Sequence, residues 1–235
     1  MSAVATAPAS EPGRGGGADV DGVATPASAL RAQTVPVPES LARLLPWGGL
    51  RRGSVVAVRG PTSLLFALLS TATTRSLSWA AVVGRPDLGL LAAAESGVAI
   101  ERLALVPRPG AELATVTAAL LDGFELVAVA GVQRLSTAEV RRLTGRARQR
   151  GAVLLPLGDW PGADVRLDGE GVEWTGLGPG HGRLRSMRLT VRASGRGAAA
   201  RPRTAELVLV GPPPPAVGRS AVDPAARPPV LRSVG

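Results

Sequence analysis

The sequence predicts an α/β fold: a mostly parallel sheet with helices on both faces, followed by C-terminal antiparallel hairpins. Between residues 54 and 157, short strands that are apolar on both faces alternate with helical segments. Strands of this kind occur in parallel sheets that helices cover on both sides. From Ala163 onward, polar and apolar residues alternate between short links rich in Gly or Arg. That alternation is typical of antiparallel strands added to one end of a sheet.

Nine short segments are expected to be strands, because each is a short apolar or alternating run. The parallel strands are Ser54–Val58, Trp79–Val83, Leu103–Val106, Leu126–Val129 and Val153–Leu157. The antiparallel strands are Val165–Leu167, Val172–Leu177, Leu184–Val191 and Thr204–Val210. The glycine-dense link Gly176–Gly182 contains the single histidine, His181, and is predicted to be a hairpin turn or loop. A dinucleotide-binding loop would instead open a helix.

Four helices are predicted between the parallel strands. The first three are Ser63–Leu69, a helix from the N-cap Asp87 to Ser96, and Ala111–Leu121. The first is apolar on every face, as in a buried helix. The fourth begins with a capping box, in which the Ser136 hydroxyl accepts from the Glu139 N–H and the Glu139 carboxylate reaches back. It ends before Gly151, a residue suited to a helix C-cap.

One folded domain, residues 40–210, is predicted between two disordered tails. Residues 1–39 are rich in Ala, Gly, Ser and Pro and show no period, so they cannot bury enough apolar surface to offset the ordering entropy. Residues 211–235 open with four consecutive prolines, which favour an extended segment. This Pro-rich tail is read as an inert tail or, because of Val230 and Leu231, as a docking peptide.

The composition excludes several classes of site. The 235 residues include no Cys, one His and no Lys, so all 27 basic residues are Arg. Thiolate metal sites, disulfides, multi-histidine metal centres and Schiff-base lysines are therefore excluded, and we expect no metal and no cofactor. No apolar run approaches the roughly 18 residues that a membrane span needs, and no signal peptide is visible. We expect a cytoplasmic protein without membrane contact.

The positive charge lies at the C-terminal end. The formal net charge is +9, and residues 141–235 hold sixteen Arg against seven Asp and Glu, which accounts for the whole excess. A cationic surface suggests an anionic partner such as nucleic acid. Seven arginines with no acid among them are candidates for binding DNA or a protein partner: Arg183, Arg185, Arg188, Arg192, Arg196, Arg201 and Arg203.

The position of a phosphate loop lacks phosphate-loop chemistry. Gly60, Pro61, Thr62 and Ser63 follow the first strand and precede a buried helix. The motif G-x-x-x-x-G-K-[ST], counted from Gly60, would require Gly, Lys and a hydroxyl where the chain has Leu65, Phe66 and Ala67. The strand Leu126–Val129 also ends without an aspartate. Without these groups a transferred phosphoryl has no cation to meet its charge, so we expect no ATPase activity.

These segments resemble the RecA-type recombinases. The similarity begins with Gly48-Gly49-Leu50-Arg51-Arg52-Gly53 and continues through Gly60-Pro61, Trp79–Val83, Ser96-Gly97-Val98, Ala111–Leu121 and Leu126–Val129. The similarity covers roughly residues 44–157 well, and it extends only loosely to the hairpins after residue 163. The resemblance places the family's catalytic glutamate near Arg85, its loop lysine near Phe66 and its strand-end aspartate at Ala130. All three functional groups are lost, so catalysis and strand exchange are not expected to transfer.

Three further segments look like the ImuA-type accessory proteins of the actinobacterial translesion mutasome. They are Ala80-Ala81-Val82-Val83-Gly84 through Asp87-Leu88-Gly89-Leu90-Leu91, Leu105-Val106-Pro107-Arg108-Pro109-Gly110, and Gly180-His181-Gly182-Arg183-Leu184-Arg185. This resemblance implies a degenerate RecA-like adaptor in damage-induced mutagenesis, associated with the nucleoid when DNA is damaged. The implied partners are an inactive ImuB-type Y-family polymerase homologue and an error-prone C-family DNA polymerase, with DNA and RecA as further candidates.

Two alternatives remain open at this stage. The first is an atypical RecA-like ATPase that holds nucleotide at Gly60–Ser63 through backbone groups alone. The second is an SOS-type regulator of recombinase filaments or of cell division. Trp47, Trp160 and Trp174 lie at strand junctions and are expected to pack in the core or at an edge; an exposed Trp would instead suggest a partner contact.

Overall fold

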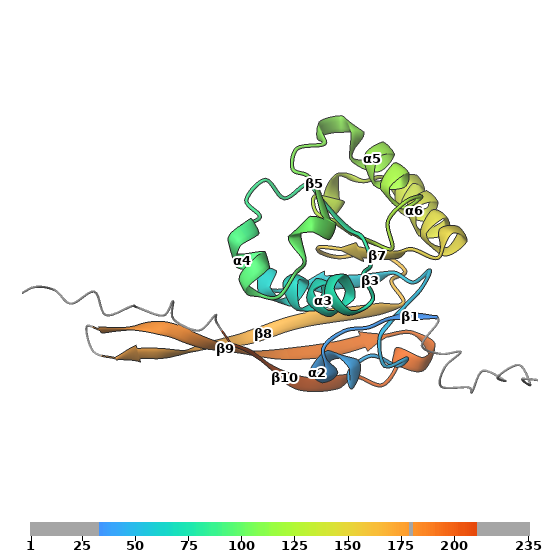
Figure 1. Cartoon of the computed structure of the whole chain (residues 1–235). Helices are drawn as coiled ribbons and strands as arrows, with labels where there is room; N and C mark the ends of the chain where they lie inside the picture. The colour runs from blue at the N-terminus through green and yellow to red at the C-terminus, as the bar shows by residue number, and fades with distance from the viewer. Residues whose placement is uncertain (1–32, 179–180, 211–235) are drawn as a thin grey trace, which may run out of the picture.

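A computed structural model describes residues 33–178 and 181–210 and folds them into two four-stranded sheets that meet edge to edge, a two-stranded sheet and helices (Figure 1). The parallel half contains β5 (Leu103–Val106), β4 (Ala80–Val83), β6 (Leu126–Val129) and β7 (Val153–Pro156), hydrogen-bonded in that order. The other half has the order β10 (Arg203–Val210), β9 (His181–Gly195), β8 (Val165–Gly178) and β3 (Val56–Arg59). Two isolated parallel bridges, Val55↔Leu154 and Val58↔Leu157, link the edge at β3 to the edge at β7. The predicted α/β class is confirmed.

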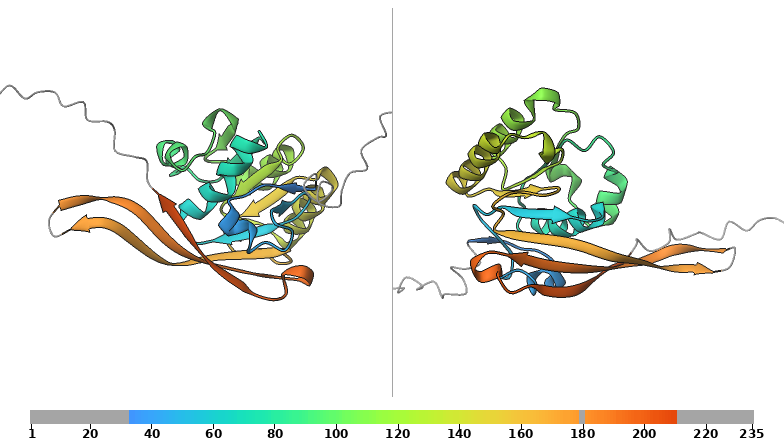
Figure 2. Two further views of the ribbon diagram at one scale, coloured as in Figure 1. Left: turned by 60° about the horizontal axis from the view of Figure 1, so that its bottom comes forward. Right: turned by 180° about the vertical axis from the view of Figure 1, so that it is seen from behind.

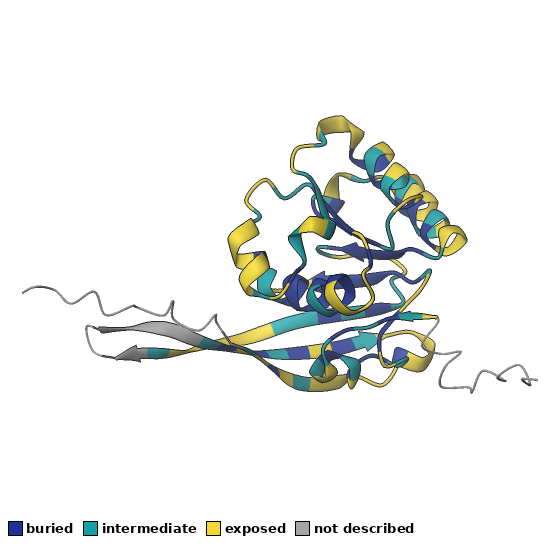
Figure 3. Ribbon diagram, in the orientation of Figure 1, coloured by how far each residue is buried: buried dark blue, intermediate teal, exposed yellow. Residues whose placement is uncertain are grey.

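Helices cover the parallel strands because those strands are apolar on both faces. The helices are α3 (Thr62–Arg75), α4 (Leu90–Glu95), α5 (Leu113–Leu120) and α6 (Thr137–Arg150). One apolar cluster joins α3 to β3, β4 and β8, and a second joins α5 and α6 to β6 and β7. β4, β6 and β7 are buried along their whole length, whereas the edge strand β5 is only partly buried (Figure 3).

The capping box of α6 forms as predicted. The Glu139 N–H donates to the Ser136 hydroxyl at 3.3 Å, and the Ser136 N–H donates to the Glu139 carboxylate at 2.8 Å. The helix ends at Gly151, which has a left-handed φ of 69°. Hydrogen bonds from Ser136 also lower the pKa of Glu139.

The second predicted helix starts later than expected. The N-cap of α4 is Gly89, and the Asp87 carboxylate is instead paired with Arg85. Asp87 was therefore the wrong N-cap, because a charged partner two residues away holds its side chain. The third predicted helix divides into a short 3₁₀ turn, Gly110–Glu112, followed by α5.

The hairpin region differs from the prediction in two respects. β8 reaches Gly178 and β9 begins at His181, so most of the predicted turn or loop Gly176–Gly182 is paired strand. β8 is one long strand where two were expected: it pairs parallel with β3 through Val56↔Val165 and antiparallel with β9 along its whole length. The pairing shifts register between Glu170 and Glu173, where Gly171 has a φ of 62°. This bulge explains the gap in the sequence pattern. β8 and β9 extend past the helices as an arm (Figure 2).

The fold begins before the predicted boundary at residue 40. β1 (Thr34–Val35) pairs with β2 (Leu50–Arg51), and the short helix α2 (Glu39–Ala42) lies between them in the chain. Val35 and Val37 are buried in the core, so residues 33–39 belong to the domain and were wrongly assigned to the tail. Two-residue strands leave no periodic signal. The rest of the predicted N-terminal tail and residues 211–235 lie outside the described residues. None of the described helices has the length and apolarity to cross a membrane.

Candidate functional site

The segment in the phosphate-loop position is a two-residue link. β3 ends at Arg59 and α3 begins at Thr62, so only Gly60 and Pro61 lie between strand and helix. A phosphate loop needs five residues between its first glycine and its lysine, whose backbone N–H groups wrap the phosphates. Here only Pro61 precedes the helix, the other four positions (residues 62–65) lie in the start of α3, and Leu65 and Phe66 are buried in the core.

Gly60 has a packing role at this link. Its φ is 127°, and a Cβ placed on it would lie 2.8 Å from the carbonyl oxygen of Gly169. A Cβ on Gly169 would in turn lie 3.3 Å from Cδ of Pro61 and 3.2 Å from Leu64. The two glycines therefore let β8 pass close to the start of α3. The glycine that marks the loop position in the sequence is required by this contact.

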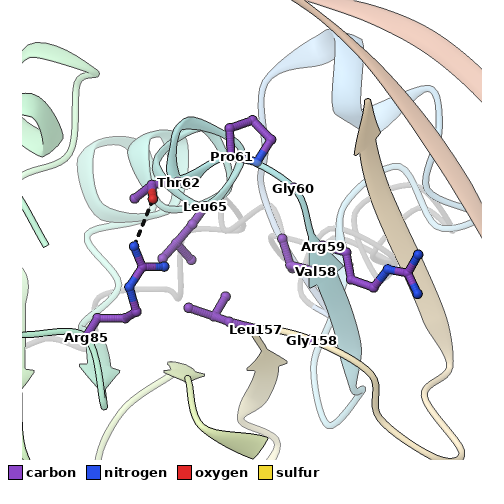
Figure 4. Close-up of a pocket in the computed structure, with 9 residues that line it drawn as sticks. All are labelled: Val58, Arg59, Gly60, Pro61, Thr62, Leu65, Arg85, Leu157 and Gly158. Carbon is purple, nitrogen blue, oxygen red and sulfur yellow. Dashed lines mark hydrogen bonds between the residues drawn. The ribbon is translucent and has the colours of Figure 1, made fainter. Parts of the chain in front are cut away.

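A small open pocket of about 260 Å³ lies beside the link (Figure 4). It is lined by Val58, Arg59, Gly60, Pro61, Thr62, Leu65, Arg85, Leu157 and Gly158. Arg85, from the loop after β4, donates to the Thr62 hydroxyl at 3.0 Å and forms an ion pair with Asp87, also at 3.0 Å. The hydrogen bond from Arg85 lowers the pKa of Asp87. Arg85 thus ties the end of β4 to the first turn of α3.

Arg59 points away from Arg85 in this view (Figure 4). Its guanidinium lies 3.0 Å from Asp159 and 2.8 Å from Asp168. The hydrogen bond to Asp159 and the charges of both carboxylates raise the pKa of Arg59. The two cations that border the pocket are therefore both held by carboxylates of this chain.

Phe66 and Ala130 stand where the resemblance to RecA-type recombinases puts the loop lysine and the strand-end aspartate, and neither side chain can hold a phosphate or a metal ion. Phe66 is 4 % exposed and lies in the core cluster. Ala130 follows β6, 8 % exposed, and its carbonyl oxygen would lie 2.9 Å from a Cβ on Gly84. No group of three or more potential metal-ligating side chains occurs among the described residues.

The candidate arginines divide into three groups. Arg183 and Arg185 lie in β9, but their side chains are outside the described residues. Arg188 and Arg192 are exposed on one face of β9, as the alternation predicted. Arg196, Arg201 and Arg203 are exposed near the β9–β10 link, where Arg203 donates to the Arg43 carbonyl at 3.3 Å.

Acidic residues from neighbouring strands lie among these arginines. Arg188 is opposite Glu173 on β8, and its side chain lies 3.9 Å from Glu206 on β10. Arg192 is opposite Asp168. The arginine run contains no acid in the sequence, but strand pairing adds carboxylates from β8 and β10 to the same face. A role for this face in binding DNA or a partner stays a prediction.

The tryptophans fall into different environments. Trp160 is 1 % exposed and donates from its indole nitrogen to the Thr144 hydroxyl at 3.1 Å, which confirms core packing. Trp47 is partly buried, with the guanidinium of Arg51 5.5 Å from its ring centroid. Trp174 is 55 % exposed on the arm, so it does not pack in the core, and the partner contact that an exposed Trp suggests stays a prediction. An exposed Trp is a common anchor of protein interfaces.

Sequence reasoning missed Arg85 as the residue that contacts the link. A signal was available, because Arg85 and Gly60 each follow the carboxyl end of a parallel strand, and such ends meet at one edge of a sheet. The pairing of Arg59 with Asp159 and Asp168 had no local signal, since these residues are about a hundred positions apart.

Comparison with known proteins identifies the family. Residues 43–162 match the family described as MT3502 N-terminal domain. The chain belongs to this family. The match covers the parallel half of the fold and stops before β8. The chain is also 40 % identical over 164 residues to "Uncharacterized protein Rv3395c" of Mycobacterium tuberculosis, covering 65 % of this chain and 80 % of that protein.

A solved structure shares the fold of this MT3502-type domain. The crystal structure of the RadB recombinase superposes with a TM-score of 0.52 at 16 % sequence identity, covering 72 % of this chain and 92 % of that one. The domain therefore has a RecA-like fold.

Proposed function

We propose that this chain is a non-catalytic accessory protein of DNA-damage-induced translesion synthesis, of the ImuA type. It binds an inactive ImuB-type Y-family polymerase homologue and an error-prone C-family polymerase, and it works in the cytoplasm at damaged DNA. The sequence resemblance to ImuA-type proteins supports the partners. The RecA-like fold supports the proposal that the protein is a degenerate member of the RecA-like proteins.

One observation carries the non-catalytic part of the proposal: a helical turn with buried Leu65 and Phe66 stands where a phosphate loop would wrap a triphosphate. Phosphoryl transfer depends on cations positioned at the transferred group. Of the two cations at this pocket, Arg85 is paired with Asp87, and Arg59 with Asp159 and Asp168. The scaffold thus acts through its surface.

Co-purification with the ImuB-type homologue tests the adaptor role. We expect the full chain to retain that homologue in a pull-down and a deletion strain to lose damage-induced mutagenesis. No association, together with normal mutation rates in the deletion strain, overturns the proposal. In a parallel titration, micromolar binding of labelled ATP that requires Mg²⁺ would favour the nucleotide-binding alternative.

A matched pair of variants locates the partner surface. Trp174, on β8, is 55 % exposed, and Leu91, on α4, is 73 % exposed. We expect Trp174→Ser to weaken retention of the homologue about thirtyfold, because an aromatic hot spot contributes about 2 kcal/mol. Leu91→Ser serves as the control and should retain it. Equal retention by both variants would exclude the arm as the contact.

A further inference from the structure

A second pocket, of about 360 Å³, lies at the amino end of β3, at the opposite end of that strand from the link with Gly60. Its lining consists of Trp47, Arg51, Arg52, Gly53, Ser54, Arg148 and Asp164. Four segments meet there: the α2–β2 link with Trp47, the residues from Arg51 to Ser54, the last turn of α6 and the segment before β8. Three arginines and one aspartate therefore line one open space.

The turn is held firmly against α6. Gly53 has a φ of 75°, and a Cβ on it would lie 3.3 Å from the Arg148 carbonyl oxygen. Ser54 is buried, and its hydroxyl donates to the Arg51 carbonyl at 2.6 Å. The backbone that carries Arg51 and Arg52 is thus fixed relative to the end of α6 before any ligand arrives.

The single carboxylate at this pocket is already engaged. One oxygen of Asp164 accepts from the Val55 N–H at 2.9 Å, and the other lies 3.5 Å from the Arg148 guanidinium. Within residues 33–178 and 181–210, Arg51 and Arg52 have no carboxylate within 4.0 Å. Like charges around one space repel unless an anion joins them. The pocket is therefore built to receive an anion.

The aromatic ring narrows the class of anion. The Arg51 guanidinium lies over the Trp47 ring, 5.5 Å from its centroid, and both groups line the pocket. Nucleobases stack on aromatic rings and on guanidinium planes, whereas an aspartate or glutamate of a protein partner has no flat π-face. Guanidinium forks also match phosphate oxygens in geometry.

We propose that this pocket binds single-stranded nucleic acid, with a base stacked on the Trp47–Arg51 pair and an adjacent phosphate on Arg52. Recognition is independent of sequence, because stacking and phosphate contacts carry no base-specific hydrogen bonds. The site is separate from the arginine face of β9, and it does not depend on the polymerase partners.

The test is fluorescence anisotropy of a labelled oligothymidylate with the full chain alone. The variant R52Q removes the cation of the pocket that has no carboxylate partner and does not lie on Trp47, and R75Q removes one exposed cation elsewhere as a matched control. We expect the pocket variant to bind about threefold more weakly and to lower the salt slope by about 0.7, the contribution of one single-strand phosphate contact. Equal losses in both variants would overturn the site.

A second readout tests the stack. Trp47→Leu should lose the quenching of tryptophan fluorescence by oligothymidylate, and Trp79→Phe, which changes an exposed Trp outside the pocket, should keep it. Binding of a duplex that is as tight as that of the single strand, or displacement by oligoglutamate at equal charge concentration, would overturn the assignment. Because no polymerase is present, these results stand apart from the pull-down.

Discussion

The two ends of β3 show opposite treatments of positive charge. At the carboxyl end, Arg59 and Arg85 are paired with carboxylates, and apolar residues of α3 pack into the adjoining core cluster. At the amino end, Arg51 and Arg52 have no such partner among the described residues, and one lies on an aromatic ring. The net charge of the chain therefore does not by itself locate a binding surface. What matters is which cations the fold leaves without a carboxylate.

The largest expected effect comes from restoring a lysine at the carboxyl end. Phe66→Lys removes a buried ring and places a charge in the core cluster, so we expect the free energy of unfolding to fall by about 4 kcal/mol or more. Urea denaturation measures the change. Arg75→Lys, on the exposed end of the same helix, is the control and should shift stability by less than about 0.5 kcal/mol. A stable Phe66→Lys protein would show that the carboxyl end of β3 can accept an unpaired cation, contrary to the contrast drawn between the two ends.

Removal of Arg85 should have a moderate effect. Arg85→Ala loses the hydrogen bond to Thr62 and the ion pair with Asp87, so we expect a cost of about 1 kcal/mol by thermal denaturation. We also expect no gain of ATP hydrolysis, because the link between β3 and α3 stays two residues long. Hydrolysis that appears in this variant would mean that Arg85 alone had blocked a competent site. Arg108→Ala, which removes an exposed arginine elsewhere, controls for the loss of charge.

The parallel half of the fold could be predicted closely because its signals are local. β5 and β6 have the predicted bounds, Leu103–Val106 and Leu126–Val129, because each strand is a short apolar run in the sequence. The capping box at Ser136 likewise predicts the start of α6. The hairpin half could not be predicted in the same detail. The parallel pairing of β8 with β3 joins segments about a hundred residues apart, and no local pattern encodes such a pairing.

The candidate sites followed the same division. Loss of phosphate-loop groups could be predicted from three residue types, since each position has one chemical requirement. The acidic residues opposite Arg188 and Arg192 could not be predicted from the sequence, because cross-strand neighbours depend on the register of strand pairing. The pocket at Trp47 and Arg148 also depends on tertiary structure, since its residues come from distant elements.

The smallest expected effect concerns the pH dependence of the Arg85–Asp87 pair. The hydrogen bond from Arg85 lowers the pKa of Asp87 in the folded protein below the ordinary 3.8. A carboxyl group whose pKa is lower in the folded than in the unfolded state stabilises the fold at pH values above its unfolded-state pKa. That contribution disappears as the pH falls through its folded-state pKa. Asp87→Asn should therefore lower Tm slightly at neutral pH, and the difference from the parent should vanish in strong acid. A difference that persists in acid would show that Asp87 acts through packing and not through its charge, and the carboxyl end of β3 would then owe less to ion pairing than the comparison holds.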